Sequence, residues 1–193
     1  MKRNLLFLLM MSGILSLTSC KSGLSDEMKA KMKQLKTDWT VFAADLPAFG
    51  DSLKTEYDRM KKKYEKIDNR IVGATMKKNM ASYSDARDAN KLTMSTMTEE
   101  YNAFKKTLSD TTAAFNNWLS KTDSMNVSDD KAKPQYESYK SFLAGSRSKL
   151  QQWESSMMTA IENSQKDIDE AIKKLGEVPK PKPKMQVAPS KTH

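Results

Sequence analysis

The chain has 193 residues and a formal net charge of +9, with 33 Lys and Arg against 24 Asp and Glu. Its only cysteine is Cys20 and its only histidine is His193, which excludes intramolecular disulfides, Ser-His-Asp or Cys-His catalysis and histidine-rich metal sites. Few glycines and prolines and a preponderance of Lys, Glu, Asp, Met, Ala, Ser and Thr favour helix over strand. We expect no cofactor and no enzymatic activity, since a Gly-rich phosphate loop is also missing.

The N-terminal segment differs in composition from the rest of the chain. Lys2 and Arg3 form a short positive region before an apolar stretch at residues 5–17. This arrangement is typical of a secretory signal peptide and is too short to span a bilayer stably. Residues 17–20 (LTSC) close the stretch with an aliphatic residue, two small residues and Cys20. They resemble the lipobox of bacterial lipoproteins.

That resemblance implies a signal peptide at residues 1–19, acylation of the Cys20 thiol and a lipidated linker at 20–24. A reactive thiol would need a neighbouring base, and a core cysteine would not end a signal peptide. Lys21 and Ser22 stand where many enterobacterial lipoproteins carry an aspartate that retains them at the inner membrane. We therefore expect a lipid anchor in the bacterial envelope, at the outer membrane and facing the periplasm or the cell surface.

The first helical segment is predicted at residues 25–72. Its apolar residues recur every three or four positions, close to a heptad repeat: Met28, Met32, Leu35, Trp39, Phe42, Leu46, Phe49, Leu53, Tyr57, Met60, Tyr64, Ile67 and Ile71. Ser25 is the expected N-cap. Pro47 allows two outcomes, a kink within one helix or a turn between two helices, and the unbroken phase favours the kink.

A turn is predicted near 73–75, where Gly73 lies, with residues 83–88 as the alternative place. A helix is then expected over about 76–122, because a second seam runs through Met94, Met97, Tyr101, Phe104, Leu108, Phe115 and Leu119. Residues 123–133 are polar and end at Pro134, which predicts a loop.

The last helix is predicted over 135–175, with Gly176 as the residue after its C-cap and Pro179 beyond it. Its apolar residues are Tyr136, Tyr139, Leu143, Leu150, Trp153, Met157, Ile161, Ile168, Ile172 and Leu175. Three segments of similar length with short connections predict an all-α domain at 25–175, an elongated antiparallel three-helix, coiled-coil-like bundle. It would have four helices if Pro47 marked a turn. Residues 176–193 are expected to be a disordered Pro/Lys-rich tail.

Few residues are candidates for binding or modification. Lys180, Lys182 and Lys184 of the tail could contact an anionic partner, with a plain spacer as the alternative. Ser52, Thr111 and Ser124 each follow an aspartate and resemble the Asp-Ser/Thr O-glycosylation motif of Bacteroidota, although Asp-Ser pairs also form caps and turns. Lysine clusters at 29–33 and 61–66 could bind lipid headgroups or cell-wall polymer, or be solvated helix faces. The methionines and aromatic residues are expected to form the core rather than a ligand groove.

These observations predict a membrane-anchored, non-enzymatic scaffold, spacer or binding module. Envelope proteins and cell-wall polymer are the candidate partners, and nucleic acid is not expected because no platform of aromatic and basic residues is evident. The alternative is a periplasmic holdase, broadly similar to the Skp-type chaperones, although no motif matches them. An enzyme with a site made only of carboxylates is a third, weaker hypothesis.

Overall fold

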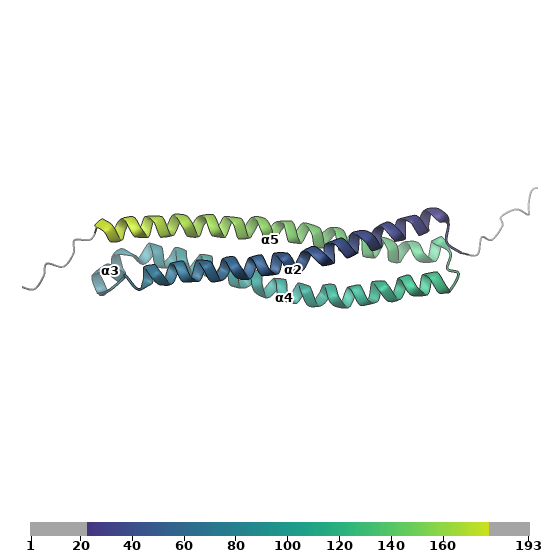
Figure 1. Ribbon diagram of the computed structural model, residues 1–193, viewed down its shortest axis with the longest axis horizontal. Coiled ribbons are helices and arrows are strands. Elements are labelled where there is room, and N and C mark those ends of the chain that lie inside the picture. The colour runs from purple at the N-terminus through teal and green to yellow at the C-terminus, as the bar shows by residue number, and fades with distance from the viewer. Residues whose placement is uncertain (1–22, 178–193) are drawn as a thin grey trace, which may run out of the picture. The chain divides into compact units, whose positions relative to one another are not determined.

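The computed structural model describes residues 23–177, which form α-helices and no strands. The helices are α2 (Asp26–Asp68), α3 (Ala74–Asn79), α4 (Ala81–Ser124) and α5 (Asp129–Glu177). Figure 1 shows α3 as a short element in the connection between α2 and α4. The predicted all-α helical bundle is confirmed. The signal peptide, residues 20–22 of the linker and the tail from residue 178 lie outside the described residues.

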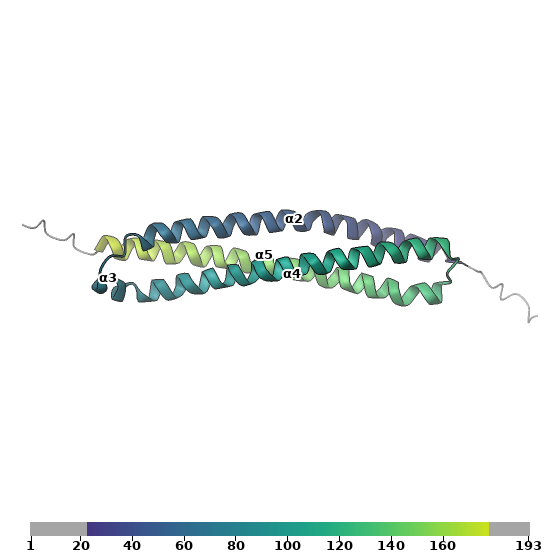
Figure 2. The same cartoon turned by 90° about the horizontal axis from the view of Figure 1, so that it is seen from below.

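The chain divides into two compact units. Unit 1 contains the described residues up to Pro47 together with Ala103–Leu150, and unit 2 contains Ala48–Asn102 together with the residues from Gln151 on. Helices α2, α4 and α5 each contribute a segment to both units. Within unit 1 these three segments lie side by side in two perpendicular views (Figures 1 and 2).

Helix α2 buries the predicted stripe. Twelve of its apolar positions from Met28 to Ile67 were expected in the core, and all are buried except the half-exposed Tyr57. Ser25 is the N-cap as predicted, because its Oγ accepts a hydrogen bond from the backbone N–H of Met28 at 3.1 Å. Ser25 also donates to Asp129, the first residue of α5, through its N–H at 2.8 Å and its hydroxyl at 2.6 Å. These bonds lower the pKa of the Asp129 carboxyl.

Pro47 lies inside α2, so the alternative of a turn between two helices at this position is wrong. The proline is exposed, and the residue four positions earlier, Ala43, is only half-buried. Water can therefore reach the Ala43 carbonyl that loses its usual donor. Leu46 and Phe49 on either side of the proline are both buried, which keeps the apolar stripe in phase through this position.

The connection between α2 and α4 follows the first of the two predicted placements. The chain leaves α2 at Asp68 and passes Gly73, whose φ of 82° lies in the region that favours glycine. The alternative turn at 83–88 is wrong, because those residues lie within α4. The sequence did not predict that the expected helix from 76 would divide into α3 and α4. The division falls at Met80, which is itself buried.

The predicted loop at 123–133 is wrong in extent. Helix α5 begins at Asp129, where the Ser128 carbonyl accepts the N–H groups of Lys131 and Ala132, both at 3.1 Å. Negative residues in the first turn suit the helix dipole, and Ala132 is fully buried, so the early start gains a core contact. Pro134 is therefore a helical residue in the second turn of α5. The Asp130 carbonyl that loses its usual donor belongs to an exposed residue, so water can reach it.

The predicted C-terminal boundary of α5 is also wrong. The helix includes Gly176 and continues to Glu177, so Gly176 is not the residue after a C-cap at Leu175. A glycine inside a helix costs only about 1 kcal/mol relative to alanine, which a long packed helix can absorb. Ile172, expected in the core, is exposed, and its neighbour Ala171 is buried in its place.

The core of unit 1 is aromatic. The Trp39 ring stacks on Phe115 with centroids 4.6 Å apart and on Phe142 at 5.6 Å, and its Nε1–H donates to Thr112 Oγ1 at 2.8 Å. Phe142 also stacks on Phe104 at 6.5 Å. Most methionine and aromatic residues of the predicted stripes are thus packed inside, as expected for core residues.

Candidate functional sites

Of the candidate residues from the sequence, the structure describes Ser52, Thr111 and Ser124. Cys20, Lys180, Lys182 and Lys184 lie outside the described residues. Ser52 is exposed in the interior of α2, where it neither caps a helix nor forms a turn. The Thr111 hydroxyl donates to the Thr107 carbonyl at 2.8 Å, and the Ser124 hydroxyl donates to the Lys121 carbonyl at 3.2 Å. Ser52 and Ser124 are thus accessible, whereas Thr111 is only partly so.

In the two predicted lysine clusters, three of the seven lysines pair with acids on their own helix: Lys29, Lys31 and Lys61. Lys31 bonds to Glu27 at 2.5 Å, and this bond raises the pKa of the lysine and lowers that of the glutamate. Lys61 pairs with Asp58 at 2.8 Å, which lowers the pKa of that carboxyl. Most of these lysines therefore belong to solvated helix faces, as the simpler interpretation expected.

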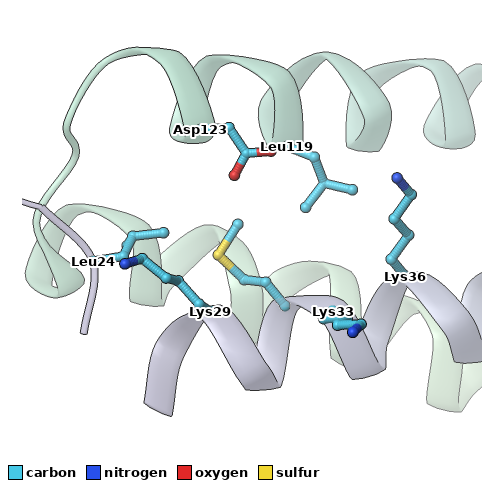
Figure 3. A pocket seen from close by; sticks show the side chains of 7 residues that line it. Leu24, Lys29, Lys33, Lys36, Leu119 and Asp123 are labelled. Atoms are coloured by element: carbon cyan, nitrogen blue, oxygen red, sulfur yellow. The ribbon is translucent and has the colours of Figure 1, made fainter. Parts of the chain in front are cut away.

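A groove in unit 1 departs from that pattern. It lies between the start of α2 and the end of α4, with a volume of about 220 Å³ (Figure 3). Its lining, which we call the lysine groove, consists of Leu24, Lys29, Met32, Lys33, Lys36, Leu119 and Asp123. Figure 3 shows the Asp123 carboxylate directed from α4 into the space. An adjoining hollow of about 500 Å³ shares Lys36, Leu119 and Asp123 and continues along α4 past Ser120 and Asn116.

A second constellation lies in the core of unit 2. The amide nitrogen of Asn90 donates to the Tyr64 hydroxyl at 3.1 Å and to Asp167 Oδ2 at 2.8 Å. Ser164 contributes a further side-chain hydrogen bond to Tyr64. We call Tyr64, Asn90, Ser164 and Asp167 the polar cluster. Its members come from α2, α4 and α5, and Tyr64 is fully buried.

Arg87 borders the polar cluster. Its guanidinium donates to Asp68 Oδ1 at 2.6 Å and to Asp88 through two nitrogens at 2.8 and 3.1 Å. The bonds to Asp88 and then Asp68 raise the already high pKa of Arg87. Burial raises the pKa of Tyr83, which packs edge-on against Tyr64, so this phenol also stays neutral in the physiological range.

Burial is the main cause of the other shifts in the polar cluster. It raises the pKa of the Tyr64 phenol, and it raises the pKa of the Asp167 carboxyl, with nearby Glu170 adding to the effect on Asp167. A raised carboxyl pKa is a feature of general acids. The adjoining hollow between Tyr83 and Asp167 holds only about 80 Å³, below the few hundred Å³ of ordinary small-molecule sites. The polar cluster therefore satisfies its own hydrogen bonds and offers little room for a substrate.

Side-chain satisfaction extends through the described chain. Across residues 23–177, every buried side-chain nitrogen or oxygen has a hydrogen-bond partner. In the same range, no three His, Cys, Asp or Glu side chains are grouped so as to hold a metal ion. None of the described helices carries an apolar run long enough to cross a bilayer.

Sequence reasoning missed the polar cluster. Counting back from Met94 by alternate steps of four and three leads to Asn90, Arg87, Tyr83 and Met80, so a strict heptad count would have placed Asn90 in the core. For the lysine groove the sequence indicated the lysines at 29–33 as candidate contacts for lipid headgroups, but it gave no sign of the apolar base, because Leu119 comes from another helix. Comparisons of the chain with protein-family models, curated proteins and solved structures found no match.

Proposed function

We propose that this protein is a bacterial envelope lipoprotein, anchored through acylated Cys20, whose helical bundle acts as a non-enzymatic scaffold, spacer or binding module. The observation that carries the proposal is the LTSC sequence at residues 17–20, placed directly after a positive region and an apolar stretch. Several acyl chains on one cysteine anchor a protein firmly, since each buried CH₂ contributes about 0.8 kcal/mol. Lys21 and Ser22, in place of a retaining aspartate, support a location at the outer membrane, on its periplasmic or surface side.

The closed core supports a scaffold in preference to a holdase. A holdase must present a large open apolar surface to unfolded clients, whereas a spacer buries its stripes. In the described chain the large apolar side chains of α2 are packed inside, apart from Val41 and the half-exposed Tyr57. The exposed ones are single residues on different turns: Val41, Val72, Leu92, Met125, Met158 and Ile172. Such scattered positions are ordinary for a protein surface.

The internal hydrogen bonds of the polar cluster support a non-enzymatic role. Tyr64, Asn90 and Asp167 bind one another, and the hollow beside them is too small for most metabolites. Other carboxylates of the described chain form ion pairs on exposed helix faces, for example Asp110 with Lys106 at 2.9 Å. Such pairs stabilise and solubilise helices.

Acylation is tested by expressing the wild type and Cys20→Ala in a bacterium fed a radiolabelled or alkyne-tagged fatty acid. The wild type should incorporate the label and float with membranes, and its intact mass should fit a chain that begins at Cys20 with acyl groups attached. Cys20→Ala should take up no label and remain uncleaved. Absence of label from the wild type would refute the anchor.

The choice between scaffold and holdase is tested by light scattering. An unfolded outer-membrane protein is diluted out of denaturant with the purified protein in molar excess. The scaffold proposal expects aggregation at the same rate as with a matched amount of serum albumin. A marked suppression would favour the holdase.

A further inference from the structure

The lysine groove is lined by more basic than acidic side chains. Lys29, Lys33 and Lys36 follow one another at helical spacing, so that they lie along one side of α2. Lys29 pairs with Asp26 at 3.5 Å, but Lys33 and Lys36 form no ion pair within residues 23–177. Asp123 is the only acidic residue among those that line the groove, so the groove has an excess of positive charge.

The base of the groove is apolar. Met32 and Leu119 are buried core residues that reach its surface, and Leu24 closes the end nearest the N-terminus. Cations above an apolar base match an anion attached to a hydrocarbon segment better than they match a free inorganic ion, which gains nothing from Met32 and Leu119. The groove is thus suited to an amphiphile with an anionic head.

The position of the groove along the chain indicates which amphiphile the groove would encounter. Leu24 follows Cys20 by four residues, and four fully extended residues span at most about 14 Å. An acyl anchor on Cys20 would therefore hold the groove within reach of lipid headgroups. Lysine ammonium groups are common ligands of phosphate, and charge-assisted bonds to phosphate oxygens are strong.

We propose that the lysine groove binds the phosphate-bearing headgroup of a membrane phospholipid. Lys33 and Lys36 hold the phosphate, and the glycerol and first methylene groups lie on Met32 and Leu119. The Asp123 carboxylate accepts a hydrogen bond from the ammonium or hydroxyl group at the end of the headgroup. This inference rests on the proposed lipid anchor, which supplies the proximity, and it adds a specific lipid contact to it.

Asp123 predicts a preference among headgroups. Phosphatidylethanolamine and phosphatidylglycerol carry N–H or O–H groups that can donate a hydrogen bond to a carboxylate. The trimethylammonium group of phosphatidylcholine has no such donor. The groove should therefore favour the first two lipids.

The test follows the reactivity of individual lysines. The purified full chain, in a phosphate-free neutral detergent, is acetylated with a water-soluble reagent with or without soluble dihexanoylphosphatidylglycerol, and each lysine is quantified by mass spectrometry. Lys33 and Lys36 should react several-fold more slowly with the lipid. Lys31 is the internal control, because it lies on the same turn of α2, pairs with Glu27 and does not line the groove. Dihexanoylphosphatidylcholine should protect less, and inorganic phosphate at the same concentration should protect little.

Matched variants locate the binding. Lys33→Gln/Lys36→Gln should weaken the calorimetric affinity for dihexanoylphosphatidylglycerol several-fold, whereas Lys62→Gln/Lys66→Gln removes the same charge from α2 in unit 2 and should leave it unchanged. Circular dichroism checks that both variants stay folded. Equal protection of Lys31, equal protection by inorganic phosphate or no protection would each overturn the proposal. The intact mass reports acylation separately: an acylated chain without lysine protection refutes only the groove, and protection without acylation refutes only the anchor.

Discussion

The two units bury different kinds of side chain. In unit 1, Trp39 and Phe115 belong to a cluster of stacked rings that uses polar atoms only at its margin. In unit 2, the fully buried Tyr64 is bound through its hydroxyl to Asn90, which in turn binds Asp167. Unit 2 also contains a smaller aromatic group, in which Phe49 stacks on Trp153 at 5.9 Å.

This difference separates stabilisation from specificity. Stacked rings bury a large apolar area, but neighbouring positions along a helix can offer similar contacts, so the free energy depends weakly on alignment. The hydrogen bonds of the polar cluster require one residue from each of α2, α4 and α5 at one level. A slip of α4 by one turn would leave those groups unpaired, at a cost of about 1–3 kcal/mol for each group. We expect the aromatic core to supply stability and the polar cluster to fix alignment, as buried polar residues do in coiled coils.

The largest effect is expected from Trp39→Ala. The change removes two stacking contacts and leaves a cavity in the core of unit 1, which should lower the free energy of unfolding by about 3–5 kcal/mol. Urea denaturation followed by circular dichroism measures it. Trp39→Phe keeps a ring but loses the hydrogen bond to Thr112, so it should cost clearly less. Equal losses for the two variants would contradict an aromatic core that stabilises through area.

Asn90→Ala should come next, at about 1–3 kcal/mol, because it leaves the Asp167 carboxylate without its amide donor. Hydrogen exchange should show faster opening around Tyr64 and little change around Trp39. Thr93→Ala alters an exposed residue one turn away on α4 and should change stability by less than about 0.5 kcal/mol. A variant as stable as the wild type would show that the polar cluster does not matter for the fold.

Gly50→Ala and Gly145→Ala should have opposite signs. A methyl group on Gly50 would overlap the ring and hydroxyl of Tyr101, which is held against Phe49 and Trp153, so overpacking should outweigh the gain in helix propensity by about 1–2 kcal/mol. Gly145 has open space around the same position, and alanine there should stabilise by up to about 1 kcal/mol. Thermal melts of the two variants provide the comparison, and a stabilised Gly50→Ala would show that Tyr101 can move aside.

The smallest effect concerns pH. Burial raises the pKa of Asp167 in the folded state, so the native protein binds this proton more tightly than the unfolded chain does. The contribution of Asp167 to the free energy of unfolding is greatest below the pKa of this carboxyl in the unfolded chain, and it falls as pH rises through the pKa in the folded protein. Near Asp167, Glu170 adds to the rise, while Lys166 and the Asn90 donor oppose it.

Asp167→Asn should remove the fall in stability that comes from ionising this carboxyl, and should stabilise unit 2 at neutral pH by less than about 1 kcal/mol. The amide oxygen can still accept the hydrogen bond from Asn90. Urea midpoints at pH 4 and pH 7 measure the change. Asp169→Asn removes the same charge from an exposed position on α5 and serves as the control. Destabilisation by Asp167→Asn at pH 7 would mean that the ionised carboxylate is favoured by the fold.

The fold was predictable where each seam position carries a large apolar residue. On α2, the apolar residues from Met28 to Ile67 recur in steps of three or four, with two consecutive steps of four at 49–53–57, and the helix follows them through Pro47. On α5 the large residues alone were misleading, because small residues occupy part of the seam. These are Ala132, Ser146, Ala160, Ser164 and Ala171, all buried. Alanine and serine are also common on solvent-exposed helix faces, so only their heptad spacing distinguishes the buried small residues from the exposed ones.

The candidate sites were less predictable, for a physical reason. A lone asparagine or aspartate in a helical sequence is usually solvated, and Asn90 and Asp167 acquire their environment only when three helices meet. Lys33 and Lys36 gain an apolar neighbour in Leu119, which lies more than eighty positions away in the sequence. The proposed lipobox is different, because a motif of this kind is a linear segment and can be proposed from sequence without a fold.

The hydrogen bonds between Ser25 and Asp129 join residues that are 104 positions apart. Helix α2 precedes α5 along the chain, so the first turn of α2 can be held by the Asp129 carboxylate only when the start of α5 packs beside it. Closing a loop of this length is entropically costly, so we expect the contact to form late in folding. The N-terminus of α2 is therefore expected to be fixed by a residue from the last helix of the bundle.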